Sequence, residues 1–222
     1  MKKMALSLAF IANLSFPLAL NAKPTKGWYT MDAMGCMIMR ECTNNVNKLN
    51  GIKDLEKNYP DTDFSLVSEE FDSMIASLNR VNVNVFLADE KYFPPGHRGV
   101  YHTVSNNFYL NDRFMHRPSV LMTVMRHEGW HAAQDCMAGS IKNSLIALIF
   151  PENKVPGVWR DIVEKTYPKS AVPFEAEAKW AGRTEGMTAK ALDACADGEM
   201  WKVYKPTPLT EKWLREERYI DN

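Results

Sequence analysis

His127-Glu128-Gly129-Trp130-His131 is the stretch of sequence on which the expected fold and chemistry depend. On an α-helix, residues four positions apart lie on one face about one turn apart. The imidazoles of His127 and His131 can therefore reach a single metal ion at about 2.0–2.1 Å. Glu128 lies about 100° further round the helix, beside the metal position, where a base can accept a proton from a metal-activated water.

The pentapeptide lies within a predicted helix over residues 118–139. Pro118 suits a first helical position, and Gly139 is a stop signal. The apolar residues before the histidines recur at helical spacing and are Val120, Leu121 and Val124. The metal face therefore continues the buried face of the helix. Gly129 costs about 1 kcal/mol relative to alanine in a helix interior, which a functional helix tolerates if something packs close to its backbone.

Two histidines alone do not make a catalytic zinc site, which needs three protein ligands and one open position. The metzincin continuation H-E-x-x-H-x-x-G-x-x-H is excluded, because Gln134 and Met137 occupy its later positions. Cys136 would face away from the metal, and no histidine follows His131 in the chain. The third ligand is therefore expected to be a downstream carboxylate on a second helix.

Residues 172–181 meet this requirement. Pro173 suits a helix start, and the alanines of the segment are strong helix formers that let two helices approach closely. The segment holds two glutamates, Glu175 and Glu177, which point in different directions from one helix. We favour Glu175 as the ligand and keep Glu177 as the alternative. At least one of the two is then expected to be an ordinary solvated helix residue.

An H-E-x-x-H helix followed by a Glu-bearing, alanine-rich helix resembles the gluzincin branch of the zincin metallopeptidases. The resemblance covers residues 97–139 and 172–182. It implies one zinc ion held by His127, His131 and Glu175, with the pKa of the bound water lowered to roughly 7.

The resemblance also implies that Glu128 acts as the general base. In gluzincins an aspartate follows the ligand glutamate at a position that is Lys179 here, or Ala181 if Glu177 is the ligand. That aspartate usually orients a ligand histidine. The chain therefore departs from the family pattern in the residues that support the metal site.

Residues 99–111 are predicted to form two short strands about a turn at 105–107. Zincins carry a strand just upstream of the active-site helix, and its exposed edge can pair with an extended peptide. The expected fold is α+β and zincin-like, with a small antiparallel or mixed sheet. Its edge strand would pack on the active-site helix, and the remainder would be mostly helical. His102 and Tyr109 are either cleft residues or ordinary strand residues.

Hydrophobic periodicity gives a coarser expectation for the other segments. Residues 31–58 are expected to be mostly helical, and residues 68–80 to form a helix with one apolar face. Residues 81–87 alternate like a strand. The apolar stretch 144–150 is too short to span a membrane and is expected to be a core helix segment.

The chain has 222 residues, a length sufficient for one domain with a substantial core. Its 27 basic and 27 acidic side chains balance. Without a basic excess, nucleic acid is not an expected partner. Lys2 and Lys3 precede an apolar run, which predicts a signal peptide over 1–22 with cleavage after Ala22. An uncleaved anchor is the alternative. Residues 23–222 are expected to form a single zincin-like metallopeptidase domain without stable membrane insertion.

If the protein is secreted, its four cysteines are expected to form two disulfides, because an even number of cysteines in an oxidising compartment favours pairing. Three pairings are possible, and we favour Cys36–Cys42 with Cys136–Cys195. The second bridge would tie the end of the active-site helix to the helix after Glu175. The expected location is secreted, either periplasmic or extracellular.

Together, these expectations predict a secreted zinc-dependent metallopeptidase that acts on peptides or proteins. Tyr204 and Arg183 are the candidates for a second oxyanion donor. Two alternatives remain: a non-peptidase zinc hydrolase built on the same helix, and a catalytically idle secreted zinc-binding protein. Glu128 argues against the second of these, because a structural zinc site needs no base.

Overall fold

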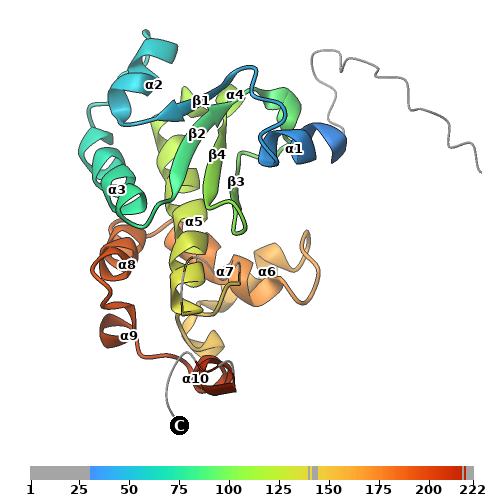
Figure 1. Ribbon diagram of the computed structural model, residues 1–222, viewed down its shortest axis with the longest axis vertical. Coiled ribbons are helices and arrows are strands. Elements are labelled where there is room, and N and C mark those ends of the chain that lie inside the picture. Colours follow the sequence, from blue (N-terminus) through green and yellow to red (C-terminus); the bar gives the residue numbers. More distant parts are fainter. Residues whose placement is uncertain (1–30, 140, 142–144, 217, 219–222) are drawn as a thin grey trace, which may run out of the picture.

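The computed structural model describes residues 31–139, 141, 145–216 and 218 (Figure 1). The predicted signal peptide, residues 1–22, lies outside the described residues. The helices are α1 (Met31–Ile38), α2 (Ile52–Asn58), α3 (Ser68–Arg80), α4 (Asp112–Met115), α5 (Pro118–Met137), α6 (Gly157–Val163), α7 (Val172–Ala181), α8 (Met187–Ala196), α9 (Met200–Val203) and α10 (Pro208–Glu216). The strands are β1 (Val46–Leu49), β2 (Asn84–Ala88), β3 (Gly99–His102) and β4 (Asn107–Asn111). Two 3₁₀ turns are η1 (Glu90–Tyr92) and η2 (Glu152–Lys154).

The four strands of the described residues form one mixed sheet in the order β1-β2-β4-β3. β2 and β4 are parallel, whereas the β1–β2 and β3–β4 pairs are antiparallel. The predicted hairpin over residues 99–111 is therefore confirmed, with Asn106 at a φ of 51° in its turn. β3 lies at the edge of the sheet, next to α5 (Figure 1). The α+β class with a small mixed sheet is confirmed.

The sheet separates two cores, because alternate strand residues face opposite sides. On β4, Phe108 and Leu110 belong to the larger core with α3, α5 and α8. Tyr109 lies between them in sequence and faces a smaller core with α1, where its ring stacks on Phe86 with centroids 5.3 Å apart. Because Tyr109 is fully buried there, it is a core residue and does not line a cleft at α5.

α5 is the central element of the larger core, and the predicted helix over residues 118–139 is confirmed as Pro118–Met137. Figure 1 shows α8 and α7 on opposite sides of its lower half. Gly129 lets α3 and α8 approach the backbone of α5. A Cβ there would lie 3.0 Å from Thr188 Cγ2 and 3.1 Å from Met74 Cε. Close packing thus explains the glycine within this helix.

Both favoured disulfides are present, Cys36–Cys42 between α1 and the turn that follows it and Cys136–Cys195 between α5 and α8. The second bridge closes 59 residues and joins the end of α5 to the helix that follows α7. Two disulfides are typical of a protein from an oxidising environment. In the part of the chain that the structure describes, no helix has the length and apolar character needed to cross a membrane.

One coarse expectation is confirmed only in part, and another is wrong. Residues 31–58 are interrupted by β1, which follows Asn45 at a positive φ of 57° and pairs with β2. The described residues 145–150 form no helix. Their amides have other acceptors, since Ala147 N donates to the Gln134 carbonyl, and the amides of Ile149 and Phe150 donate to the Glu177 carboxylate. The predicted strand over 81–87 is confirmed with shifted bounds, as Asn84–Ala88.

Candidate metal centre

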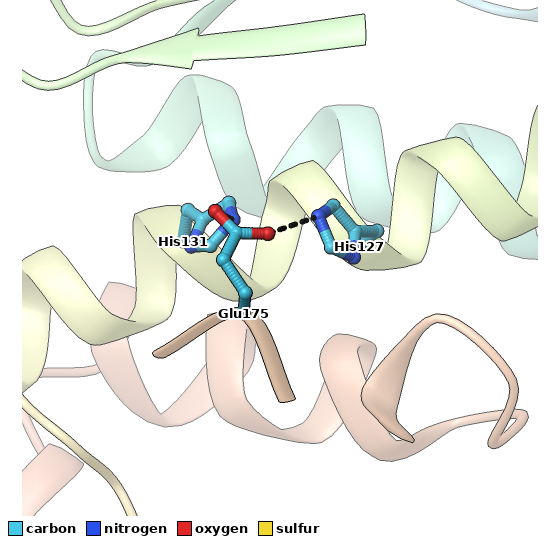
Figure 2. A group of neighbouring side chains, drawn as sticks. All are labelled: His127, His131 and Glu175. Atoms are coloured by element: carbon cyan, nitrogen blue, oxygen red, sulfur yellow. Dashed lines mark ion pairs between the residues drawn. The ribbon is translucent and has the colours of Figure 1, made fainter. Parts of the chain in front are cut away.

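His127 and His131 lie one turn apart on the face of α5 that meets α7. Figure 2 shows both rings beside the Glu175 carboxylate, which extends toward them from α7. The ring centroids of the histidines are 5.0 Å apart and their planes are nearly perpendicular. The helical spacing read from the sequence therefore does bring the two imidazoles together, as predicted.

Glu175 is the carboxylate that joins the two histidines. Its Oε2 lies 3.3 Å from His127 Nε2, and its Oε1 lies 3.5 Å from His131 Nε2. Small residues let α7 approach α5 closely, since Ala178 and Ala181 are fully buried in the shared core. Glu175 therefore meets the geometry expected of the third ligand.

Glu177, the alternative ligand, has a different role. Its carboxylate is fully buried on another face of α7, where it accepts hydrogen bonds from Trp130 Nε1 at 2.9 Å and from the amide of Phe150 at 2.6 Å. Burial raises the pKa of Glu177, while these donors act to lower it. The expectation that the other glutamate is solvated is therefore wrong, because Glu177 is a buried link between α5, α7 and residues 149–150.

The triad fits a divalent metal ion. Two ligands of a tetrahedral zinc ion with bonds of about 2.0–2.1 Å lie about 3.3 Å apart. Each histidine Nε2 lies at a similar distance, 3.3 or 3.5 Å, from one of the two Glu175 oxygens. Glu175 Oε2 is buried and accepts no hydrogen bond, which is unfavourable for a carboxylate oxygen unless a cation is bound. Within the described ranges, His127, His131 and Glu175 are the one group of three or more such side chains close enough to hold a metal.

Part of the site remains open to solvent. The side chains of His127 and Glu175 are each 17% exposed, and that of His131 is 12% exposed. Three protein ligands with partial exposure leave a position for water or substrate, as in catalytic rather than structural sites. Nitrogen and carboxylate donors suit zinc and neighbouring transition metals.

Strong electrostatic coupling joins the three side chains in the absence of a metal. Burial alone would lower the pKa of His131, but the hydrogen bond and charge of Glu175, with a further contribution from Glu128, raise it to about 9. Burial would likewise raise the pKa of Glu175, but both histidines hold it well below its usual range. The metal-free site therefore carries a proton on His131 at neutral pH.

We expect zinc binding at neutral pH to release about one proton per metal ion, because His131 Nε2 must be unprotonated to bind it. Since the pKa of His131 is raised to about 9, zinc affinity should fall as the pH is lowered from that value. The decrease should approach about tenfold per pH unit. Calorimetric titration in buffers of different ionisation enthalpy measures the released proton. Binding heats that are equal in all buffers at neutral pH would contradict this expectation.

Glu128 lies between the triad and the edge strand. Its Oε2 accepts a hydrogen bond of 3.0 Å from the backbone amide of Tyr101 on β3. The Tyr101 hydroxyl donates to Asp135 Oδ2 at 2.8 Å, so one residue of β3 contacts α5 at two points along the helix. Burial raises the pKa of Asp135 to about 7. The expected packing of the edge strand on the histidine-bearing helix is therefore present.

Gly99 is the residue that allows β3 to lie this close to α5. A Cβ at this position would lie 2.6 Å from Val124 Cγ1 and 3.1 Å from Glu128 Cγ. We expect Gly99→Ala to destabilise the fold by about 1–3 kcal/mol through overpacking and to displace Glu128. Thermal unfolding with and without zinc measures this loss in the free energy of unfolding.

Gly157→Ala is the matched control, because a Cβ at Gly157 would meet nothing within 4 Å. Equal melting temperatures for Gly99→Ala and Gly157→Ala would show that the approach of β3 to α5 is not tight.

Tyr167 is a site residue that the sequence did not reveal. Burial and the charges of Glu175 and Glu128 raise the pKa of its phenol, although the residue as a whole is 38% exposed. Tyr204 instead packs edge-on against Phe150, with ring centroids 5.7 Å apart. No spacing rule connects Tyr167 to Glu175, because it precedes α7 in a loop.

Two other sequence candidates lie apart from the triad. Arg183 is exposed just after α7, and within the described part of the chain no contact joins it to the metal-site residues. His102 Nδ1 lies 2.8 Å from Ser105 Oγ within the β3–β4 hairpin, and burial lowers the pKa of its ring. The polar partner of His102 is therefore a residue of the same hairpin.

The triad and its neighbours come from three elements that are distant in sequence: β3, α5 and α7. Their convergence brings two imidazoles and the Glu175 carboxylate into a group that could hold a metal ion. Comparison of the chain with protein-family models, with curated proteins and with solved structures gives no match.

Proposed function

We propose that this protein is a secreted zinc-dependent metallopeptidase with a zincin-like fold. The observation that carries the proposal is the Glu128 carboxylate, held by the amide of Tyr101 beside the group of His127, His131 and Glu175. A structural metal site needs its ligands alone, whereas a hydrolytic site also needs a base next to them. Glu128 supplies that base.

Each residue of the site has a distinct role in peptide hydrolysis. When bound by His127, His131 and Glu175, zinc supplies a Lewis acid and lowers the pKa of water. Glu128 accepts the proton of the attacking water and then delivers it to the departing amine. The Tyr101 amide orients the Glu128 carboxylate during both transfers.

Tyr167 is our candidate for the donor that stabilises the developing oxyanion. Its phenol is close enough to Glu175 and Glu128 for their charges to raise its pKa, so it stays protonated over the working pH range. A protonated phenol can donate a hydrogen bond to a negatively charged oxygen. It replaces Tyr204 and Arg183 in this role.

A peptide or protein substrate is supported by the position of β3. The strand lies at the edge of the sheet and runs beside α5, and an extended peptide can add to such an edge through backbone hydrogen bonds. The two disulfides and the apolar N-terminal run after Lys2 and Lys3 support export as the route to its substrates.

The test is to measure zinc content and cleavage of an unfolded protein substrate by residues 23–222. We expect close to one zinc per chain, cleavage that a chelator abolishes, and recovery when zinc is restored. Bound zinc without cleavage of any peptide or protein would overturn the peptidase proposal and favour another zinc hydrolase. Cleavage that persists after zinc removal would overturn the zinc-dependent mechanism.

A further inference from the structure

We propose that Gln134 and Glu177 form a relay that determines which ring nitrogen of His131 binds the metal. The inference rests on the metal site of the proposed function, but not on peptide cleavage. Gln134 lies three residues after His131 on α5, and Glu177 lies on α7. Both side chains are fully buried, so neither interacts with solvent.

The relay begins with the orientation of the Gln134 amide. Its Nε2 lies 3.2 Å from the backbone carbonyl of Phe174 and 2.7 Å from Glu177 Oε2. A backbone carbonyl can only accept hydrogen bonds, so the nitrogen of the amide must face Phe174. The opposite orientation would direct Gln134 Oε1 at two acceptors and leave it unpaired in the core.

This orientation determines the tautomer of His131. Because Gln134 Nε2 donates to Phe174 and Glu177, the other amide atom, Oε1, faces His131. Gln134 Oε1 lies 2.8 Å from His131 Nδ1. An amide oxygen accepts hydrogen bonds only, so Nδ1 must carry the hydrogen. Nε2 then has the free lone pair when the ring is neutral, and Nε2 is the atom that faces Glu175 Oε1 at 3.5 Å.

Glu177 holds the far end of the relay in place. Its two oxygens accept hydrogen bonds from Trp130 Nε1 and from the amides of Ile149 and Phe150, in addition to the bond from Gln134. Indole and backbone N–H groups can only donate, so the carboxylate acts as an acceptor at both oxygens. Trp130 of α5 and the backbone of residues 149–150 therefore hold the carboxylate against which Gln134 is positioned.

The test compares zinc affinity in three variants and the native chain by competition with a chelator. Gln134→Met keeps the length of the side chain and removes all three of its hydrogen bonds. We expect a 10–100-fold loss of zinc affinity, the usual effect of losing the partner of a ligand histidine. Gln134→Glu retains an acceptor for Nδ1 but places a second buried carboxyl group against Glu177. We expect it to lower the melting temperature while zinc affinity stays close to native.

Thr188→Val is the matched structural control. Thr188 is fully buried, and its hydroxyl donates a hydrogen bond of 2.8 Å to the backbone carbonyl of Arg126 on α5. The variant therefore loses one buried hydrogen bond away from the metal face. We expect lower thermal stability and native zinc affinity. An equal loss of zinc affinity in Thr188→Val and Gln134→Met would overturn the relay, because general loosening of α5 would then explain both.

Nitrogen-15 NMR of the zinc-loaded native chain tests the tautomer directly. We expect His131 to show a protonated Nδ1 and a metal-bound Nε2, whereas binding through Nδ1 would overturn the proposal even if every variant behaved as expected. None of these measurements uses a substrate. A chain that binds zinc through His131 Nε2 but cleaves no peptide would contradict the proposed function and leave the relay intact.

Discussion

Replacing Glu128 with glutamine is expected to lower the rate of peptide hydrolysis by about 10²–10⁴-fold, the usual contribution of a general base. Zinc content should be unchanged, because Glu128 is not one of the three metal ligands. Glutamine can still accept the Tyr101 amide through its side-chain oxygen, so β3 and α5 should stay in contact. The loss should therefore appear in kcat, with little change in KM.

The measurement is steady-state hydrolysis of an unfolded protein, with zinc quantified in the same preparation. Glu56→Gln, at an exposed position of α2, is the control for the change in charge. Native activity in Glu128→Gln would exclude Glu128 as the base. Loss of activity together with loss of zinc would mean that Glu128 supports the metal rather than the proton transfer.

Replacing Glu175 with alanine is expected to lower zinc affinity by about 10²–10³-fold. Structural zinc sites bind with about 10–16 kcal/mol in total, so one ligand of four accounts for a few kcal/mol. The metal-free variant should lose some thermal stability, because the pair between Glu175 and His131, whose pKa Glu175 raises, is removed. Competition with a chelator and thermal unfolding of the metal-free protein measure the two effects.

Glu185→Ala is the matched control, since Glu185 is an exposed glutamate shortly after α7. It should keep native zinc affinity. Normal zinc content in Glu175→Ala would remove Glu175 from the ligand set and with it the fit of the triad to a tetrahedral site.

The departure from the gluzincin pattern at Lys179 has a structural counterpart. In that pattern an aspartate beyond the ligand glutamate orients a ligand histidine, and here the partner of His131 is Gln134 on the same helix as the histidine. Glu177 supports Gln134 from α7. In the proposed relay, Gln134 and Glu177 together would orient His131, and no spacing rule in the helix of Glu175 would identify them.

Local patterns were sufficient for the elements that carry the ligands. The four-residue spacing of His127 and His131 follows from the helical period, and the apolar residues before them marked the buried face. The alanine-rich segment 172–181 likewise carries its own helical preference. These predictions depended on residues within a few turns of one another, and the structure confirms both helices.

Long-range contacts explain the expectations that failed. β1 is only four residues long and exists because it pairs with β2, nearly forty residues away in the chain. Residues 145–150 have helical hydrophobicity, but the amides of Ile149 and Phe150 bind the Glu177 carboxylate, which no local pattern encodes. Propensity is a weak prior wherever such tertiary partners compete for the backbone.

By itself, the sequence determined that one helix presents His127, Glu128 and His131 together, because the period of an α-helix is the same in every fold. It also narrowed the third ligand to Glu175 or Glu177. Only the tertiary structure shows that Glu175 is the one that joins the histidines, because the packing of α7 on α5 sets which face of α7 meets them. The same packing buries Glu177, and the packing of β3 on α5 brings the Tyr101 amide to Glu128.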